Sequence, residues 1–140
     1  MNGRVPVALA VAAMLSGCSI KETLISPLFK VCAKLPENST YVLDSRPPVD
    51  FDEGVLKVGD KSLSVYTGHN PDFAKKNRLG APADRNFVYV GKQRGQEIDK
   101  ILFAQRGMRN EILYVMFSGD GLDTENPLSG VSLSTCKNPQ

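Results

Sequence analysis

The stretch GVLKVGDKSLSVYT, residues 54–67, decides the fold that the sequence predicts. Apolar and polar residues alternate on both sides of Gly59-Asp60, and this period of two is typical of half-buried strands. Leu63 and Val65 would share one face of the second strand with Thr67. Because glycine and aspartate favour a tight turn between two such runs, we predict an antiparallel β-hairpin here.

Strand patterns continue through the rest of the chain. Residues 111–117, EILYVMF, are apolar on both faces, which predicts a central strand covered on both sides. Further strands are predicted at residues 41–43, 87–90, 99–105 and 131–136. Short polar connections favour antiparallel pairing. The expected fold class is therefore mainly β, with α+β as the alternative: a small antiparallel sheet that forms a sandwich or half-barrel.

A short helix is expected near the N-terminus of this sheet. Within residues 19–31, Leu24, Leu28 and Val31 fall at helical spacing and would form one apolar face. Pro27 limits the length of such a helix. We expect it to pack on one face of the sheet.

The first residues have the pattern of a processing signal rather than of folded structure. Arg4 is the only charge before the uncharged run Val5–Leu15. This run is too short to cross a bilayer as a helix, which takes about 20 apolar residues. Leu15-Ser16-Gly17-Cys18 follows it directly.

Leader and cysteine together resemble the signal peptide and lipobox of bacterial lipoproteins. The resemblance implies cleavage before Cys18, a diacylglycerol on its thiol and a further acyl chain, such as palmitate, on its new amino group. Several acyl chains would hold the protein on a membrane. Since Ser19 stands where inner-membrane lipoproteins have Asp, the resemblance also implies sorting to the outer membrane, facing the periplasm.

This resemblance covers residues 1–18 and implies nothing about the activity of the mature domain. The expected division of the chain is a signal peptide at 1–17, a lipidated tether with a short helix at 18–36, and a β-rich periplasmic domain at 37–140.

Two further cysteines, Cys32 and Cys136, lie near the two ends of the mature chain. The compartment implied by the resemblance is oxidising, so we expect a disulfide that pins the N-terminal segment to the last strand. Two buried thiols, or a redox or metal role, are the alternatives. The spacing excludes CxxC chemistry, and a single histidine leaves too few ligands for zinc. No cofactor is expected.

Charge is nearly balanced overall but unevenly distributed, with 17 Lys and Arg against 15 Asp and Glu. Residues 37–60 hold six acids and two bases, whereas residues 75–109 hold nine bases and three acids. Either the fold brings the two regions together as neutral surface, or the basic region forms a face for an anionic partner. A nucleic-acid partner is not expected in this compartment.

Residues 68–86 form a long polar segment of the kind that often carries function. We assign the recognition of a protein partner to this segment and to the cations beside it. The candidate partner-binding residues are His69, Phe73, Lys75, Lys76, Arg78, Arg85 and Arg94. No nucleophile elbow of the GxSxG kind is present, and we name no catalytic residue.

A second, weaker candidate site is the acidic run GDGLDTEN. Asp120, Asp123 and Glu125 bring oxygen atoms close together, as a calcium loop does, but the full twelve-residue pattern is missing. A polar loop is the alternative.

The function expected from these features is non-enzymatic. The chain would be a lipid-anchored envelope protein whose β-rich domain binds a protein partner in the periplasm, as an inhibitor, an immunity factor or an assembly accessory. A structural subunit of an envelope or secretion complex is the alternative, followed by a small hydrolase or a calcium-binding domain.

Overall fold

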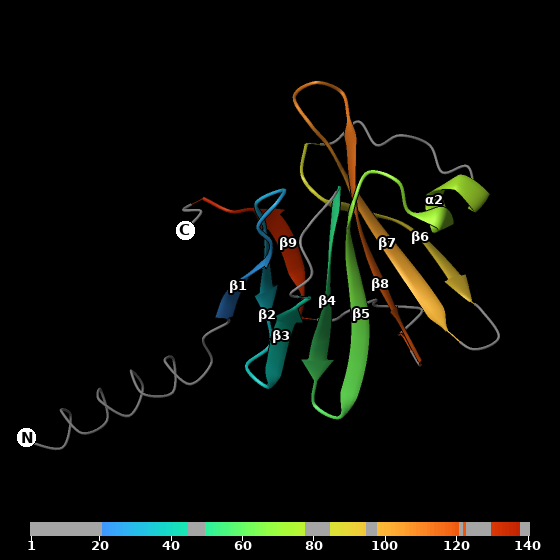
Figure 1. The fold of residues 1–140 in the computed structure, drawn as a ribbon. Coiled ribbons are helices and arrows are strands. Elements are labelled where there is room, and N and C mark those ends of the chain that lie inside the picture. Colours follow the sequence, from blue (N-terminus) through green and yellow to red (C-terminus); the bar gives the residue numbers. More distant parts are fainter. Residues whose placement is uncertain are drawn as a thin grey trace, which may run out of the picture.

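A computed structural model describes residues 21–44, 50–77, 85–94, 98–120, 122 and 130–137. These residues form nine strands and one short helix (Figure 1). The predicted mainly β fold class is confirmed, with the strands arranged in two antiparallel sheets. No helix in this part of the chain is long and apolar enough to cross a membrane.

The larger sheet has six strands in the order β3-β4-β5-β8-β7-β6. Its strands are β3 (Ser39–Leu43), β4 (Phe51–Val58), β5 (Lys61–Gly68), β6 (Val88–Arg94), β7 (Asp99–Arg106) and β8 (Ile112–Gly119). The smaller sheet has the order β1-β2-β9. Its strands are β1 (Lys21–Ser26), β2 (Val31–Leu35) and β9 (Ser132–Thr135).

The hairpin predicted at residues 54–67 is the β4–β5 pair. Val58 lies opposite Lys61, which leaves Gly59 and Asp60 as a two-residue turn. Gly59 has a φ of +62°, the sign that a type II′ turn needs at its first central position. The three residues expected to share one face of β5 are all buried.

The hydrophobic core lies between the two sheets. The smaller sheet contributes Ile25, Val31, Ala33 and Leu35, and the larger sheet contributes Leu56, Leu63, Val65, Ile101, Leu113, Val115 and Phe117. Tyr41 Oη of β3 donates a hydrogen bond to the Ile25 carbonyl at 3.0 Å. Gln105 Nε2 of β7 donates one to Thr135 Oγ1 at 3.2 Å. The smaller sheet therefore spans the larger one from β3 to β7, as in a sandwich.

Strand β8 is central, as predicted, but it is fully covered on one face only. Its inward residues are buried, whereas Ile112, Tyr114 and Met116 on the outer face are half-buried. The outer face is covered at β7 instead, because α2 (Asp72–Asn77) packs there and buries Phe73 and Leu102. Figure 1 shows α2 beside β6 and β7. On the outer face between β3 and β8, Val42, Val55 and Ser64 are exposed.

The prediction of a short helix within residues 18–36 is wrong, because the described part of this segment forms β1 and β2. Pro27 begins a turn that ends at Lys30, where φ is +57°. The turn reverses the chain, so β1 pairs with β2 and buries Ile25. Residues assigned to a tether thus contribute to the core of the domain.

The predicted disulfide joins Cys32 and Cys136 across a sequence separation of 104 residues. Cys32 lies in β2 and Cys136 directly follows β9. The Cys136 N–H also donates a hydrogen bond to the Lys30 carbonyl at 2.9 Å. The last strand therefore pairs with β2 in the smaller sheet and not with a strand of the larger sheet.

Candidate functional site

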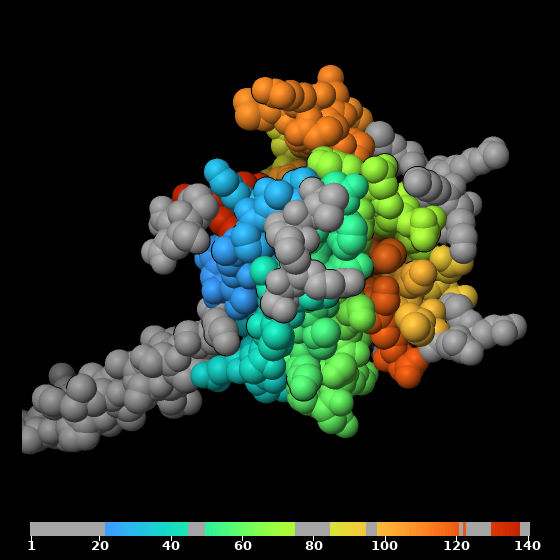
Figure 2. Space-filling view, viewed as in Figure 1, coloured from blue at the N-terminus to red at the C-terminus, as the bar shows by residue number. Residues whose placement is uncertain are grey.

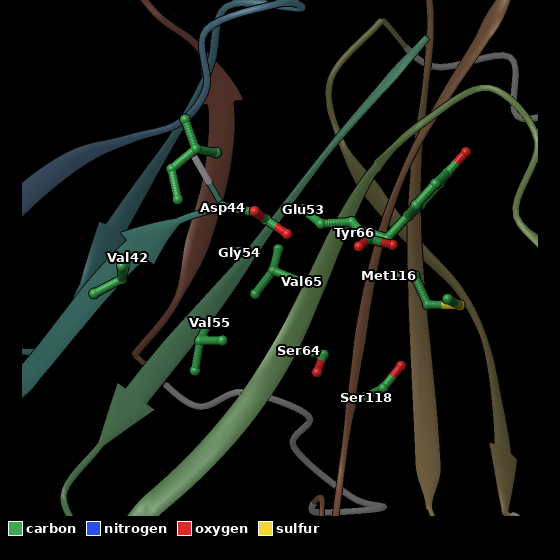
Figure 3. Close-up of a pocket in the computed structure, with 11 residues that line it drawn as sticks. Val42, Asp44, Glu53, Gly54, Val55, Ser64, Val65, Tyr66, Met116 and Ser118 are labelled. Atoms are coloured by element: carbon green, nitrogen blue, oxygen red, sulfur yellow. The ribbon is translucent and has the colours of Figure 1, made fainter. Parts of the chain in front are cut away.

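The outer face of the six-stranded sheet, turned away from the smaller sheet, carries a depression of about 350 Å³ (Figure 3). Two rows of residues line the depression. Within each row, the residues are cross-strand neighbours on successive strands of the sheet. One row is Val42, Val55, Ser64 and Ser118, and the other is Asp44, Glu53, Tyr66 and Met116. The lining residues thus come from β3 and the residue that follows it, and from β4, β5 and β8.

The position of Tyr66 keeps this depression open. The ring leans over Gly68, where an added Cβ would collide with the phenol. It stacks on Phe51 with 5.6 Å between ring centroids, and its hydroxyl accepts a hydrogen bond from the Asn70 N–H at 3.2 Å. Partial burial, more than any other cause, raises the pKa of Tyr66, so the phenol is neutral near pH 7. Figure 3 shows the ring pointing away from Ser64.

The lining of the depression combines apolar and acidic groups. Val42 is 63% exposed and Val55 is 40% exposed, so both present methyl groups to solvent. Asp44 follows Val42 by two residues, just past the end of β3, and Glu53 precedes Val55 by two residues on β4. An apolar side chain with a cationic group beside it is the chemistry that such a surface accommodates.

A second exposed feature is the β7–β8 hairpin, which stands out from the body of the domain (Figures 1 and 2). The Gly107 N–H donates a hydrogen bond to the Glu111 carbonyl at 2.8 Å, and the Asn110 N–H donates one to the Gly107 carbonyl at 3.2 Å. Asn110 has a φ of +63°. The loop therefore has three residues and consists of a type I turn followed by a residue in the left-handed region, which is a common conformation in β-hairpins.

Met108 occupies the loop of this hairpin. Its side chain is 86% exposed, more than any other large apolar side chain in the described ranges. Arg109 follows it and is also exposed. The hairpin therefore presents an apolar group and a cation on an ordered turn.

The hairpin and the start of the described chain lie at opposite ends of the sandwich. Lys21 pairs with Leu35, and Gly59 donates a hydrogen bond to the Asn38 carbonyl, so β1 starts at the end that holds the β4–β5 turn. The β7–β8 hairpin lies at the other end, where β5 finishes.

His69 lies at this second end and is exposed. Its Nδ1 donates a hydrogen bond to the Ile112 carbonyl at 2.7 Å, and its ring contacts Phe29 edge-on with 5.0 Å between centroids. Because a carbonyl only accepts, Nδ1 carries the proton. His69 thus joins the start of β8 to the turn between β1 and β2, directly beside the hairpin.

The other predicted partner-binding residues are dispersed. Arg85 is exposed at the same end as His69, and its carbonyl accepts a hydrogen bond from Gln105 Nε2 at 2.7 Å. Arg94 lies at the opposite end of β6, across from Asp99. Phe73 is only 1% exposed and belongs to the packing under α2, so it offers no surface to a partner.

Several predicted site residues lie outside the described residues: Cys18 with the whole segment 1–17, Arg78, Asp123 and Glu125, together with the side chains of Lys75 and Lys76. Asp120 is described and exposed. Within the described ranges, no three or more His, Cys, Asp or Glu side chains are grouped to hold a metal ion.

Sheet order separates the acidic and the basic regions of the chain. The acidic residues 37–60 form β3 and β4 at one edge of the larger sheet, and the basic region supplies β7 and β6 at the other edge. Strands β5 and β8 lie between them. The strands of the two regions are therefore not neighbours.

Sequence reasoning missed Met108, Val42 and Val55. An apolar residue inside the turn sequence GMRN was the available signal for the first, since turns of this kind favour polar residues. The valines occupy outward positions of alternating strands, but only the sheet order shows that they are adjacent.

Comparison with known proteins gives no match to a protein-family model, a curated protein or a solved structure.

Proposed function

We propose that this chain is a lipid-anchored protein of the bacterial envelope whose sandwich binds a protein partner through the β7–β8 hairpin. The observation that carries the proposal is the 86% exposure of Met108 on a hydrogen-bonded turn. A side chain held on a defined turn loses less conformational freedom on binding than one on a mobile loop. Methionine and arginine are also enriched where proteins meet.

The lipobox supports the anchored part of the proposal. A lipid on Cys18 would hold the end of the sandwich at which the described chain starts, at Lys21. The hairpin lies at the other end, so a partner would reach it from the side away from the anchor.

The chemistry of the hairpin indicates the chemistry of its partner. Met108 requires an apolar recess, and Arg109 favours carboxylates close to that recess. His69 and Arg85, at the same end of the domain, extend the polar rim of the contact. Such a partner is a folded protein whose surface has an apolar recess with acidic residues around it.

An affinity pull-down from detergent-solubilised envelopes, with the lipidated protein tagged at its C-terminus, tests the binding. We expect Met108→Asp to lower recovery of the partner about tenfold, the scale for a central interface residue. Ile98→Asp is the matched control, because Ile98 is 47% exposed and precedes β7 at the opposite end. Partner recovery that survives Met108→Asp contradicts the proposed surface.

Cys18→Ala tests the anchor in the same preparation. We expect the variant to leave the membrane fraction, and we expect mass spectrometry of the native protein to find an acylated N-terminal peptide that begins at Cys18. An unmodified N-terminus contradicts the anchor. Loss of a whole set of membrane components with Cys18→Ala would instead favour a structural subunit of an envelope complex.

A further inference from the structure

We infer that the hairpin of one copy of this chain docks in the outer-face depression of a second copy. The inference rests on the proposed function, because it uses the same hairpin and names its partner. Hairpin and depression are separate surfaces of the domain, so one molecule offers both halves of the contact.

The two surfaces match in chemistry. The hairpin offers Met108 with Arg109 next to it, and the depression offers Val55 with Glu53 two residues away on β4. Two residues along a strand span about 7 Å, a distance that the long arginine side chain can bridge while the methionine contacts the valine. An unbranched methionine also adapts to an irregular apolar recess.

Strand β3 repeats this arrangement beside β4. Val42 lies opposite Val55, and Asp44 donates its N–H to the Glu53 carbonyl at 2.8 Å. The apolar and acidic positions therefore form two adjacent pairs rather than isolated residues. One pair would receive the methyl end of Met108 and the other would face the guanidinium of Arg109.

The charge distribution favours the same contact. The acidic residues that line the depression are Asp44, which follows β3, and Glu53 of β4, whereas the hairpin extends from β7, within the basic region. Docking brings surfaces of opposite sign together.

Because the hairpin and the depression are different surfaces, the contact between two copies is heterologous, and successive copies would form a ring or an open chain.

Photo-cross-linking of the full lipidated protein in its own membrane tests the inference. A benzophenone side chain replaces Met108, and the adducts are sized after illumination. We expect a product of twice the mass that contains only this chain, with cross-linked peptides from β4 or β8. Val55→Lys in the same chain should lower this product about tenfold. The same photo-reactive group at Ile98 is the positional control.

Two differently tagged copies give a second test. Met108→Asp keeps the depression and Val55→Lys keeps the hairpin, so neither variant should associate with itself, whereas a mixture of the two should form pairs. Val42→Lys replaces Val55→Lys if the latter fails to fold, since Val42 is 63% exposed. Mixtures that do not pair overturn the inference.

The adducts also separate this inference from the proposed function. An adduct with a different protein alone overturns self-association and leaves the proposed partner-binding surface standing. No adduct from position 108 overturns both.

Discussion

Two tyrosines of the larger sheet each lie over a glycine, one on each face. On the outer face Tyr66 covers Gly68 and shapes the depression. On the inner face Tyr41 covers Gly54, where an added Cβ would collide with the Tyr41 phenol and approach the Val42 carbonyl. Any side chain at these glycines would displace the rings, so glycine here serves close approach rather than turn formation.

Tyr41 gives the sandwich a defined response to alkaline pH. Burial raises the pKa of the Tyr41 phenol, and the nearby Asp52 carboxylate raises it further. Below about pH 10 the phenol is protonated in both folded and unfolded chains. Above that pH the unfolded chain releases a proton that the folded chain retains, so the free energy of unfolding decreases as the pH rises.

Urea unfolding from about pH 8 to about pH 11 measures this effect. The wild-type unfolding midpoint should fall more steeply above about pH 10 than that of Tyr41→Phe, which has no phenol to titrate. At neutral pH the variant should be less stable by about 1 kcal/mol, because it loses the hydrogen bond to Ile25. Parallel curves for the two proteins would contradict the assigned role of Tyr41.

At the scale of elements, the β4–β5 hairpin was predictable and the N-terminal strands were not. The β4–β5 hairpin depends on local alternation and on Gly59-Asp60, all within residues 51–68. Strand β1 depends on contacts far along the chain. Ser26 donates a hydrogen bond to Asp52 Oδ2 at 2.6 Å, and the Leu28 N–H donates one to the same oxygen at 3.1 Å.

These tertiary contacts override the helical spacing of Leu24, Leu28 and Val31. Leu28 ends in the turn and is 43% exposed, whereas Val31 begins β2 and is buried. A periodic pattern of three residues is too short to distinguish a helix from two strands joined by a turn. The position of β9 beside β2 could be approached from the sequence only through the predicted disulfide, because the alternating pattern of residues 131–136 does not indicate which strand they pair with.

The smaller sheet should depend strongly on the disulfide. Cys32 and Cys136 close a loop of 104 residues, for which the chain-entropy model gives a stabilisation of about 4–5 kcal/mol. We expect the double variant Cys32→Ala, Cys136→Ala to lose about this free energy of unfolding in urea.

Hydrogen exchange locates the effect of that variant. The amides of β1, β2 and β9 should lose protection first, and those of β4, β5 and β8 should lose it last, since the latter pair within the larger sheet. Uniform loss of protection over both sheets would contradict a local role for the bridge. Cys18→Ala is the control for cysteine removal outside the sandwich.

At the scale of the whole molecule, composition conceals the charge separation. The net charge of +2 suggests a nearly neutral surface. The acidic region 37–60 and the basic region 75–109 could either lie together and neutralise each other or lie apart on the surface. Strand order decides between them, and long-range pairing is the information that one sequence does not contain. The depression also depends on the strand order of the larger sheet, because β8 lies next to β5 there although the two strands are not consecutive along the chain.

This charge layout predicts that docking through the hairpin depends on salt. Arg109 is exposed, so its attraction to an acidic surface acts through solvent and is screened by ions. Raising NaCl from about 50 mM to about 500 mM shortens the screening length to roughly 4 Å. The yield of the photo-adduct from position 108 should then fall several-fold.

Arg109→Gln separates the charge from the apolar contact. The variant should give a lower adduct yield in dilute salt and a flat salt response, because the apolar photo-reactive side chain at position 108 contacts its recess without charge. Lys34→Gln is the matched control, since Lys34 is exposed on β2 in the smaller sheet and should leave the response unchanged. An adduct yield that does not change with salt in the chain with Arg109 intact would assign the contact to the apolar side chain at position 108 alone and remove Asp44 and Glu53 from it.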